Sequence, residues 1–186
     1  WYIRDNGSSD DSVSIVNGWN DPHIKHFSVG HNRHNFAQGQ QTLVHAYVHQ
    51  QNILREPEEC HFTSEQANLD DTYLLLLNDD VEFADEISLK KMIDLMDANP
   101  QIGVVGCRLL YNGTDILQHS GVIFSKKYNS MPYHYRHQVK SDAAAEQNRY
   151  FQSVTAAVCL FRLNDFIRAD GFDMNLRWAF CDICLN

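Results

Sequence analysis

The segment 73–77 constrains the fold of this chain more than any other. It consists of one tyrosine and four leucines, and a strand that is apolar at every position is typical of a sheet covered on both faces. The run stops at Asn78-Asp79-Asp80. In an α/β sheet, polar residues at the carboxyl end of a buried strand lie where ligands bind. The sequence therefore predicts a buried strand with a polar site at its end.

Strand-like and helix-like segments alternate before this run, and mainly strand-like segments follow it. The predicted strands cover 1–4, 26–29, 73–77, 103–110, 116–124 and 153–161. Helices are predicted over 12–17, 40–54 and 164–168, and Ser88 is the predicted cap of a further helix in which Leu89, Met92, Ile93 and Met96 recur at helical spacing. Polar residues predict a loop at 55–71, a turn at Asn112-Gly113 and a mobile stretch at 128–148. This order indicates an α/β sandwich with a mixed sheet.

The composition excludes some classes of function. Across 186 residues, 15 Lys and Arg oppose 24 Asp and Glu, which gives a net charge of −9. We expect no nucleic-acid partner, because no basic run offers a surface for phosphates. No apolar stretch approaches the roughly 20 residues that span a bilayer. The five cysteines are scattered, which favours a reducing compartment over a disulfide framework.

The segment Asn78-Asp79-Asp80 is the strongest candidate for chemistry. Glu82 stands two residues further on, and together these side chains are hard oxygen donors of the kind that bind Mg²⁺ or Mn²⁺. Such an ion keeps several waters and takes further ligands from a substrate diphosphate. The alternative is an ordinary polar turn after a strand.

Two further acidic residues are weaker candidates. Asp5 opens a turn-forming segment after a predicted strand, where its side chain could accept a hydrogen bond from a ribose hydroxyl or a base N–H. Asp182 follows Trp178 and Phe180 closely, and an apolar setting would raise its pKa towards that of a general base. The alternatives are a simple turn for Asp5 and a solvated helix cap for Asp182.

A zinc-binding domain is a further interpretation, because histidines gather at two places in the sequence. Cys181 and Cys184 have the spacing of a redox or zinc-knuckle pair, but no second cysteine pair accompanies them. None of the histidines has the spacing of a zinc finger. The histidines concerned are His23, His26, His31, His34, His134 and His137.

An ordered set of segments extends over nearly the whole chain. It includes residues 3–10 (IRDNGSSD), 74–81 (LLLLNDDV), 118–122 (QHSGV) and 171–173 (GFD), with others at 30–39, 107–111, 153–157 and 180–182. In this order the segments resemble motifs of the family 2 glycosyltransferases with the GT-A fold, in particular the bacterial polysaccharide and rhamnosyltransferase-like group. Residues 55–71 form an insertion relative to that family, and Asp170 stands where it has a glycine.

The resemblance implies a GT-A α/β/α sandwich with a mixed, mainly parallel central sheet. Residues 73–77 would be a central strand, parallel to the strand that ends at Ile3. The chain would be a single, partial catalytic domain with a nucleotide-binding half at 1–80 and an acceptor-side half at 81–186. The family's first strand and the end of its domain have no counterpart here, so we expect a piece of a longer protein.

The resemblance also assigns roles to single residues. Asp80 would contact Mn²⁺ or Mg²⁺, and Asp182 would remove the acceptor's proton in a single inverting displacement. From the reach of a general base, we expect these two carboxylates roughly 7–12 Å apart. The implied nucleotide-binding residues are Asp5, Asn6, Ser8, Asn78 and Asp79.

The function that the resemblance implies is the transfer of a sugar from a UDP- or dTDP-sugar to a hydroxyl group. The acceptor would be a glycan or a lipid-linked molecule, and the protein would be cytoplasmic, with peripheral association at the inner face of the membrane. The alternative is a non-catalytic GT-A-like module that binds a carbohydrate or a protein. Metal-dependent binding of a nucleoside diphosphate distinguishes the enzyme from the module.

Overall fold

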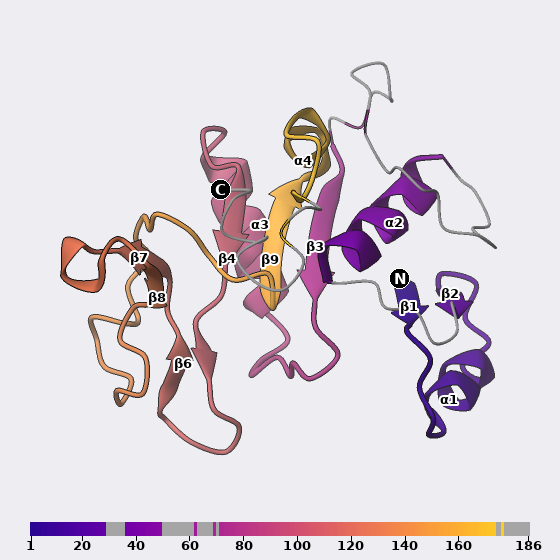
Figure 1. Cartoon of the computed structure of the whole chain (residues 1–186), viewed down its shortest axis with the longest axis horizontal. Coiled ribbons are helices and arrows are strands. Elements are labelled where there is room, and N and C mark those ends of the chain that lie inside the picture. Colours follow the sequence, from indigo (N-terminus) through magenta and orange to yellow (C-terminus); the bar gives the residue numbers. More distant parts are fainter. Residues whose placement is uncertain (29–35, 50–61, 63–68, 70, 174–175, 177–186) are drawn as a thin grey trace. The chain divides into compact units, whose positions relative to one another are not determined.

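The structure is a computed structural model of the chain, and it describes residues 1–28, 36–49, 62, 69, 71–173 and 176 (Figure 1). The chain divides into two compact units. The first unit comprises residues 1–68 and 167–181, and the second unit comprises residues 69–166 and 182–186. Each unit contains at least one sheet of its own.

The first unit contains a two-stranded parallel sheet and two helices. Strand β1 (Tyr2–Asp5) pairs in parallel with β2 (Lys25–Ser28). Helix α1 (Ser12–Gly18) connects the two strands along the chain, and α2 (Phe36–Val48) follows β2. The carboxyl ends of β1 and β2 therefore lie side by side, with Asp5 opposite Ser28 in the register.

Ring contacts and one close backbone approach hold α2 against the strands. The ring of Tyr2 lies 6.0 Å from that of Phe27 and 5.6 Å from that of Tyr47, measured between centroids. Gly39 is buried within α2, and a Cβ at this position would lie 2.5 Å from Nη1 of Arg4. Glycine weakens a helix interior by about 1 kcal/mol relative to alanine. The close approach of the arginine explains why a glycine occupies this position.

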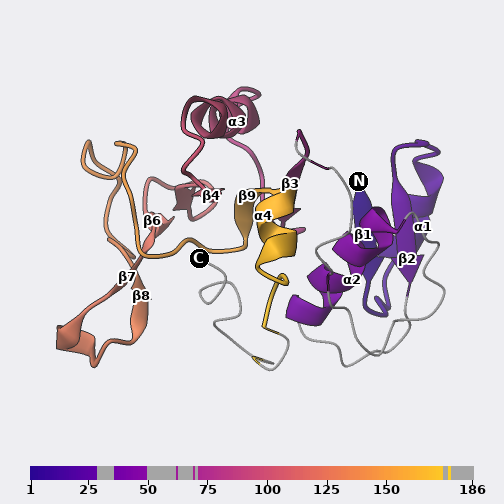
Figure 2. The ribbon, with the colours of Figure 1, turned by 90° about the horizontal axis from the view of Figure 1, so that it is seen from above.

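The second unit is built on a three-stranded antiparallel sheet in the order β3 (Tyr73–Leu77), β9 (Val158–Arg162) and β4 (Val104–Gly106). Strand β9 lies between its two neighbours (Figure 1), and four of its five residues are buried. Helix α3 (Ser88–Ala98) lies along one face of this sheet, as Figure 2 shows. The centre of the sheet is therefore β9.

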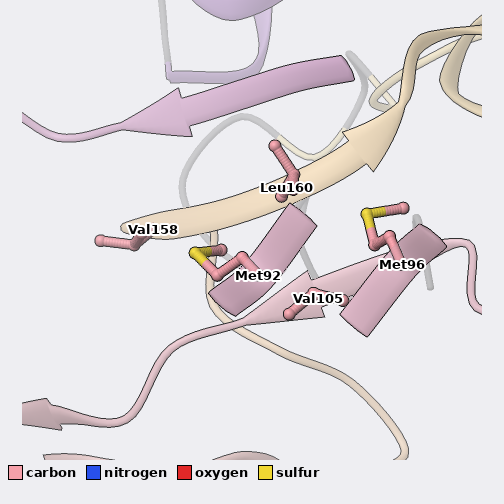
Figure 3. Close-up of a cluster of buried hydrophobic side chains, with 5 residues drawn as sticks. All are labelled: Met92, Met96, Val105, Val158 and Leu160. Carbon is pink, nitrogen blue, oxygen red and sulfur yellow. The ribbon is translucent and has the colours of Figure 1, made fainter. Parts of the chain in front are cut away.

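A compact apolar cluster fills the space between α3 and the sheet (Figure 3). Its buried members are Met92 and Met96 from α3, Val105 from β4, and Val158 and Leu160 from β9. The two methionines are four residues apart and so project from the same side of the helix. Burying one such side chain contributes about 1.5–3 kcal/mol, so this cluster anchors the second unit.

Shorter elements complete the second unit. Strand β5 (Leu109–Leu110) pairs antiparallel with β6 (Leu117–His119), and β7 (Val122–Phe124) pairs antiparallel with β8 (Pro132–His134). The 3₁₀ helix η1 (Lys126–Tyr128) also belongs to this unit, and helix α4 (Leu163–Arg168) begins in it directly after β9, with its last two residues assigned to the first unit.

The predicted GT-A α/β/α sandwich with a mainly parallel sheet is wrong. Most strands are short and antiparallel, and they form several small sheets. Within the described residues, β3 is an edge strand of its sheet, not a central one, and β1 pairs with β2, not with a sheet that contains β3. Only Leu76 of β3 is fully buried. An apolar run indicates that a strand is buried, but it does not indicate whether the neighbouring strands are parallel or antiparallel to it.

Individual elements follow the predicted pattern more closely. The strand over 73–77 and the hairpin around Asn112-Gly113 are confirmed. The helix predicted over 40–54 starts at Phe36 and ends at Val48. The stretch 128–148, predicted to be mobile, contains β8.

The cap predicted at Ser88 is wrong in detail. The residue at the cap position of α3 is Ile87, and it makes no side-chain cap hydrogen bond. The Ser88 hydroxyl instead donates to Oδ1 of Asp85 at 2.6 Å.

Candidate functional site

The turn after β1 orients the carboxylate of Asp5. Its Oδ2 accepts hydrogen bonds from the backbone N–H of Gly7 and from the hydroxyl of Ser28, each at 3.0 Å, and its Oδ1 accepts from the backbone N–H of Ser8 at 3.0 Å. Gly7 has a φ of 90°, which favours glycine over other residues. The sequence folds this way because Asp followed by Asn-Gly is a strong turn former.

These hydrogen bonds lower the pKa of Asp5 to about 2. The largest contribution comes from the Ser8 side chain, and the backbone N–H groups and Ser28 add to it. Asp5 is therefore ionised at neutral pH. A carboxylate offers about four acceptor positions, so a ribose hydroxyl that bound Asp5 would take the place of a serine hydroxyl. The predicted neighbours Asn6 and Ser8 are both exposed.

The acidic segment after β3 lies in the second unit. The backbone N–H of Asn78 donates to the carbonyl of Ala157 at 2.9 Å, which continues the pairing with the β9 region. The side chain of Asn78 is half-buried, whereas Asp79, Asp80 and Glu82 are exposed. The segment thus extends from the sheet edge towards solvent.

The donor set at this segment fits a hard cation in chemistry but is incomplete. Among the residues that the structure describes, no group of three or more His, Cys, Asp or Glu side chains could hold a metal ion. Carboxylate oxygens suit Mg²⁺ and Mn²⁺, and Mg²⁺ is commonly held by one or two carboxylates with substrate phosphates and waters. A cation at Asp80 would therefore depend on a bound diphosphate for its remaining ligands.

Several predicted site residues lie outside the described residues. Asp182, the predicted base, is one of them, so its expected separation from Asp80 stays a prediction. The cysteine pair at 181 and 184 and the aromatic residues at 178 and 180 lie outside as well, as do His31 and His34.

The structure brings together His134, one of the histidines considered above as a zinc ligand, and His119, which was not among them. His119 on β6 is buried, and its Nδ1 lies 2.6 Å from Nδ1 of His134 on β8. The alternation of side chains along β6 could have indicated this burial, because His119 stands two residues from the buried Leu117 and so shares its face. The two residues belong to one unit, and their contact joins the buried His119 to the exposed His134.

The sequence matches no protein-family model and no curated protein. Within the described part of the chain, none of the helices has the length and apolar character needed to cross a bilayer. Two separate candidate features therefore rest on the residues themselves: the oriented carboxylate of Asp5 in the first unit, and the acidic end of β3 in the second unit.

Proposed function

We propose that this chain is part of a nucleotide-sugar-dependent, inverting glycosyltransferase. The observation that carries the proposal is the carboxylate of Asp5, which is ionised and held in one orientation at the carboxyl end of β1. A second acidic segment, Asp79-Asp80, follows β3. A carboxylate can accept a hydrogen bond from a ribose hydroxyl, and it can also bind a cation that takes its other ligands from a diphosphate. The resemblance of these segments to the family 2 glycosyltransferases supports the same function.

Each residue has a role that follows from its chemistry. Asp5 accepts hydrogen bonds from the ribose or the base, and the neighbouring Asn6 and Ser8 line that end of the nucleotide. Taken by itself, the end of β3 in the second unit offers Asn78 and Asp79 for contacts to a nucleoside diphosphate, and Asp80 would hold Mn²⁺ or Mg²⁺. When bound, the cation offsets the charge that develops on the departing diphosphate.

The transfer is a single displacement with inversion. Asp182 accepts the proton of the acceptor hydroxyl as its oxygen forms a bond to the anomeric carbon of the donor sugar. The bond from that carbon to the diphosphate breaks at the same time, and the nucleoside diphosphate leaves. We propose a UDP- or dTDP-sugar as donor and a glycan or lipid-linked acceptor, with the enzyme in the cytoplasm or bound at the inner face of the membrane.

A non-catalytic module that binds a carbohydrate or a protein is the second candidate. The exposure of both Asp79 and Asp80 favours it, because the protein around a catalytic cation usually provides a dry, shaped cavity. Such a module would bind a glycan without metal or nucleotide.

Calorimetric titration with UDP and with dTDP, with and without Mn²⁺, tests the proposal. We expect Mn²⁺-dependent binding that Asp80→Asn weakens by about tenfold or more, equivalent to about 1.4 kcal/mol. The matched control is Asp94→Asn, which removes an exposed carboxylate paired with Lys90 on α3 and leaves binding unchanged. Binding of a glycan that is indifferent to metal and nucleotide would instead support the module.

A further inference from the structure

The β7–β8 hairpin is joined to β6 by a short, regular set of hydrogen bonds. The backbone N–H of Tyr135 donates to the carbonyl of Gly121 at 2.8 Å, and the hydroxyl of Ser120 donates to the carbonyl of Tyr135 at 2.9 Å. Further along, Gln138 N–H donates to the carbonyl of Leu117 at 2.8 Å. The segment after β8 therefore runs beside β6, and both belong to the second unit (Figure 1).

The histidine pair lies at the start of this junction. His119 is 1% exposed, and its ring meets that of His134 edge to face with centroids 4.8 Å apart. The Nδ1 atoms of the two rings are 2.6 Å apart. The other ring nitrogen of His119, Nε2, accepts a hydrogen bond from the backbone N–H of Gly121 at 3.1 Å. Both nitrogens of His119 are thus engaged.

This arrangement determines where the protons are. A backbone N–H can only donate, so Nε2 of His119 carries no proton, and a neutral ring then has its proton on Nδ1. That proton is donated to Nδ1 of His134, which must be unprotonated. His134 therefore carries its proton on Nε2 and is neutral as well. The contact exists only while both imidazole rings are uncharged.

We propose that the His119–His134 pair is a pH-sensitive latch that joins the β7–β8 hairpin to β6 and opens when His134 is protonated. A proton on Nδ1 of His134 would face the N–H of His119, so two donors would meet and the contact would break. When the contact opens, the buried Nδ1–H of His119 loses its acceptor, and an unsatisfied buried donor costs free energy. The latch is independent of the proposed transferase activity.

The groups around the two rings determine which of them takes up a proton as the pH falls. Burial, with a smaller effect of His134, lowers the pKa of His119 to about 3, so His119 stays neutral across the mildly acidic range. From the loop after β8, the His137 ring lies 5.8 Å from that of His134, and its Nδ1 is 2.9 Å from the carbonyl of Gln118. Across β5, the residue paired with His119 is the apolar Leu109.

The charged groups near the junction are engaged in ion pairs. Arg136 pairs with Asp142, and the other pairs are Lys140 with Asp115 at 2.5 Å and Arg108 with Glu146 at 3.4 Å. Each of these carboxylates is thus paired with a cation.

The first test is the nitrogen chemical shifts of the two imidazole rings in the unmodified chain. At about pH 7.5, where an unperturbed histidine is neutral, we expect the proton of His119 on Nδ1 and that of His134 on Nε2. A proton on Nε2 of His119, or a cationic His134 at this pH, overturns the proposal. This measurement needs no variant and so stands even if a substituted chain fails to fold.

The second test is hydrogen exchange of the amides of Leu117, Tyr135 and Gln138, corrected for the intrinsic effect of pH. We expect exchange to speed up about tenfold between about pH 7.5 and pH 5.5. In His134→Gln the amide oxygen can accept from His119 without titrating, so the response should disappear. In the control His137→Gln it should persist. Equal exchange at both pH values, or a full response in His134→Gln, overturns the latch.

Discussion

The side-chain oxygen of Gln41 accepts a hydrogen bond from the backbone N–H of Phe172 at 3.2 Å. Gln41 is fully buried in α2, and its amide nitrogen donates to the carbonyl of Asp170 at 2.9 Å. One side chain thus satisfies two backbone groups of a turn that follows far along the chain. In this turn Asp170 and Gly171 both have left-handed backbone conformations, with φ of 59° and 66°.

The first prediction concerns Gln41. Gln41→Leu keeps the side-chain volume but removes this partner from the carbonyl of Asp170 and from the buried N–H of Phe172, and the latter costs about 1–3 kcal/mol. We expect the free energy of unfolding to fall by about 2 kcal/mol or more, measured by urea denaturation. Gln40→Met on the same helix is the control and should change it by less than about 0.5 kcal/mol. A matching small effect for Gln41→Leu would show that the contact contributes little.

Gly171 gives a second prediction. A Cβ at this position would overlap the side-chain oxygen of Gln41, and the φ of 66° strains any residue with a side chain. Gly171→Ala should destabilise the chain by about 2 kcal/mol or more. The control is Gly18→Ala in α1, where nothing lies within 4 Å of the added Cβ. That change should be neutral or stabilise by up to about 1 kcal/mol. Thermal unfolding of both variants side by side makes the comparison, and equal shifts would contradict it.

The third prediction tests the core beneath α3. Met96 is fully buried in the apolar cluster of Figure 3, whereas Met131 is 52% exposed. Met96→Ala leaves a cavity and should reduce the free energy of unfolding by about 2–5 kcal/mol. Met131→Ala removes the same atoms from a surface position and should cost less than about 0.5 kcal/mol. Similar losses in the two variants would mean that the cluster is not the anchor of the second unit.

The fourth prediction concerns pH. The pKa of Asp5 is lowered to about 2 in the folded chain, chiefly by hydrogen bonds from Ser8. The folded state therefore binds fewer protons than the unfolded state, and the stability from Asp5 is present above about pH 4 and lost as the pH falls towards about 2. Asp5→Asn should flatten this part of the stability curve, and the exposed control Asp71→Asn should not. If Asp5→Asn leaves the loss of stability between about pH 4 and pH 2 unchanged, the turn does not stabilise the ionised carboxylate as proposed.

Local elements were predictable from the sequence, and their arrangement was not. The strand 73–77 and the helix around Met92 and Met96 follow from patterns within about ten residues, which short-range physics determines. The neighbour of β3 is β9, which lies about 80 residues further along the chain. The apolar run carried no information on that pairing or on its antiparallel direction. The α/β sandwich with a mixed sheet that the order of segments indicated is also wrong, because the described strands form separate sheets, each of them either parallel or antiparallel.

The candidate site shows the same division. The Asp-Asn-Gly turn orients Asp5 through hydrogen bonds from its neighbours in the sequence, with Ser28 as a distant partner. The turn around Asp5 was therefore predictable from the local sequence. The His119–His134 pair depends on β6 meeting the end of β8. The local sequence indicated only that His119 shares a strand face with Leu117, which lies two residues before it. It contained no information on which residue His119 would contact.

The most direct test of the central claim, that the acidic end of β3 holds a metal-bound diphosphate, is the effect of Mn²⁺ on amide signals. Mn²⁺ is paramagnetic and broadens the signals of residues close to it. With UDP present, we predict that Mn²⁺ broadens Asn78, Asp79 and Asp80 first, and that Asp80→Asn removes this selectivity. Broadening that is absent, or no stronger there than at Asp94 and Asp97 on α3, would contradict the claim.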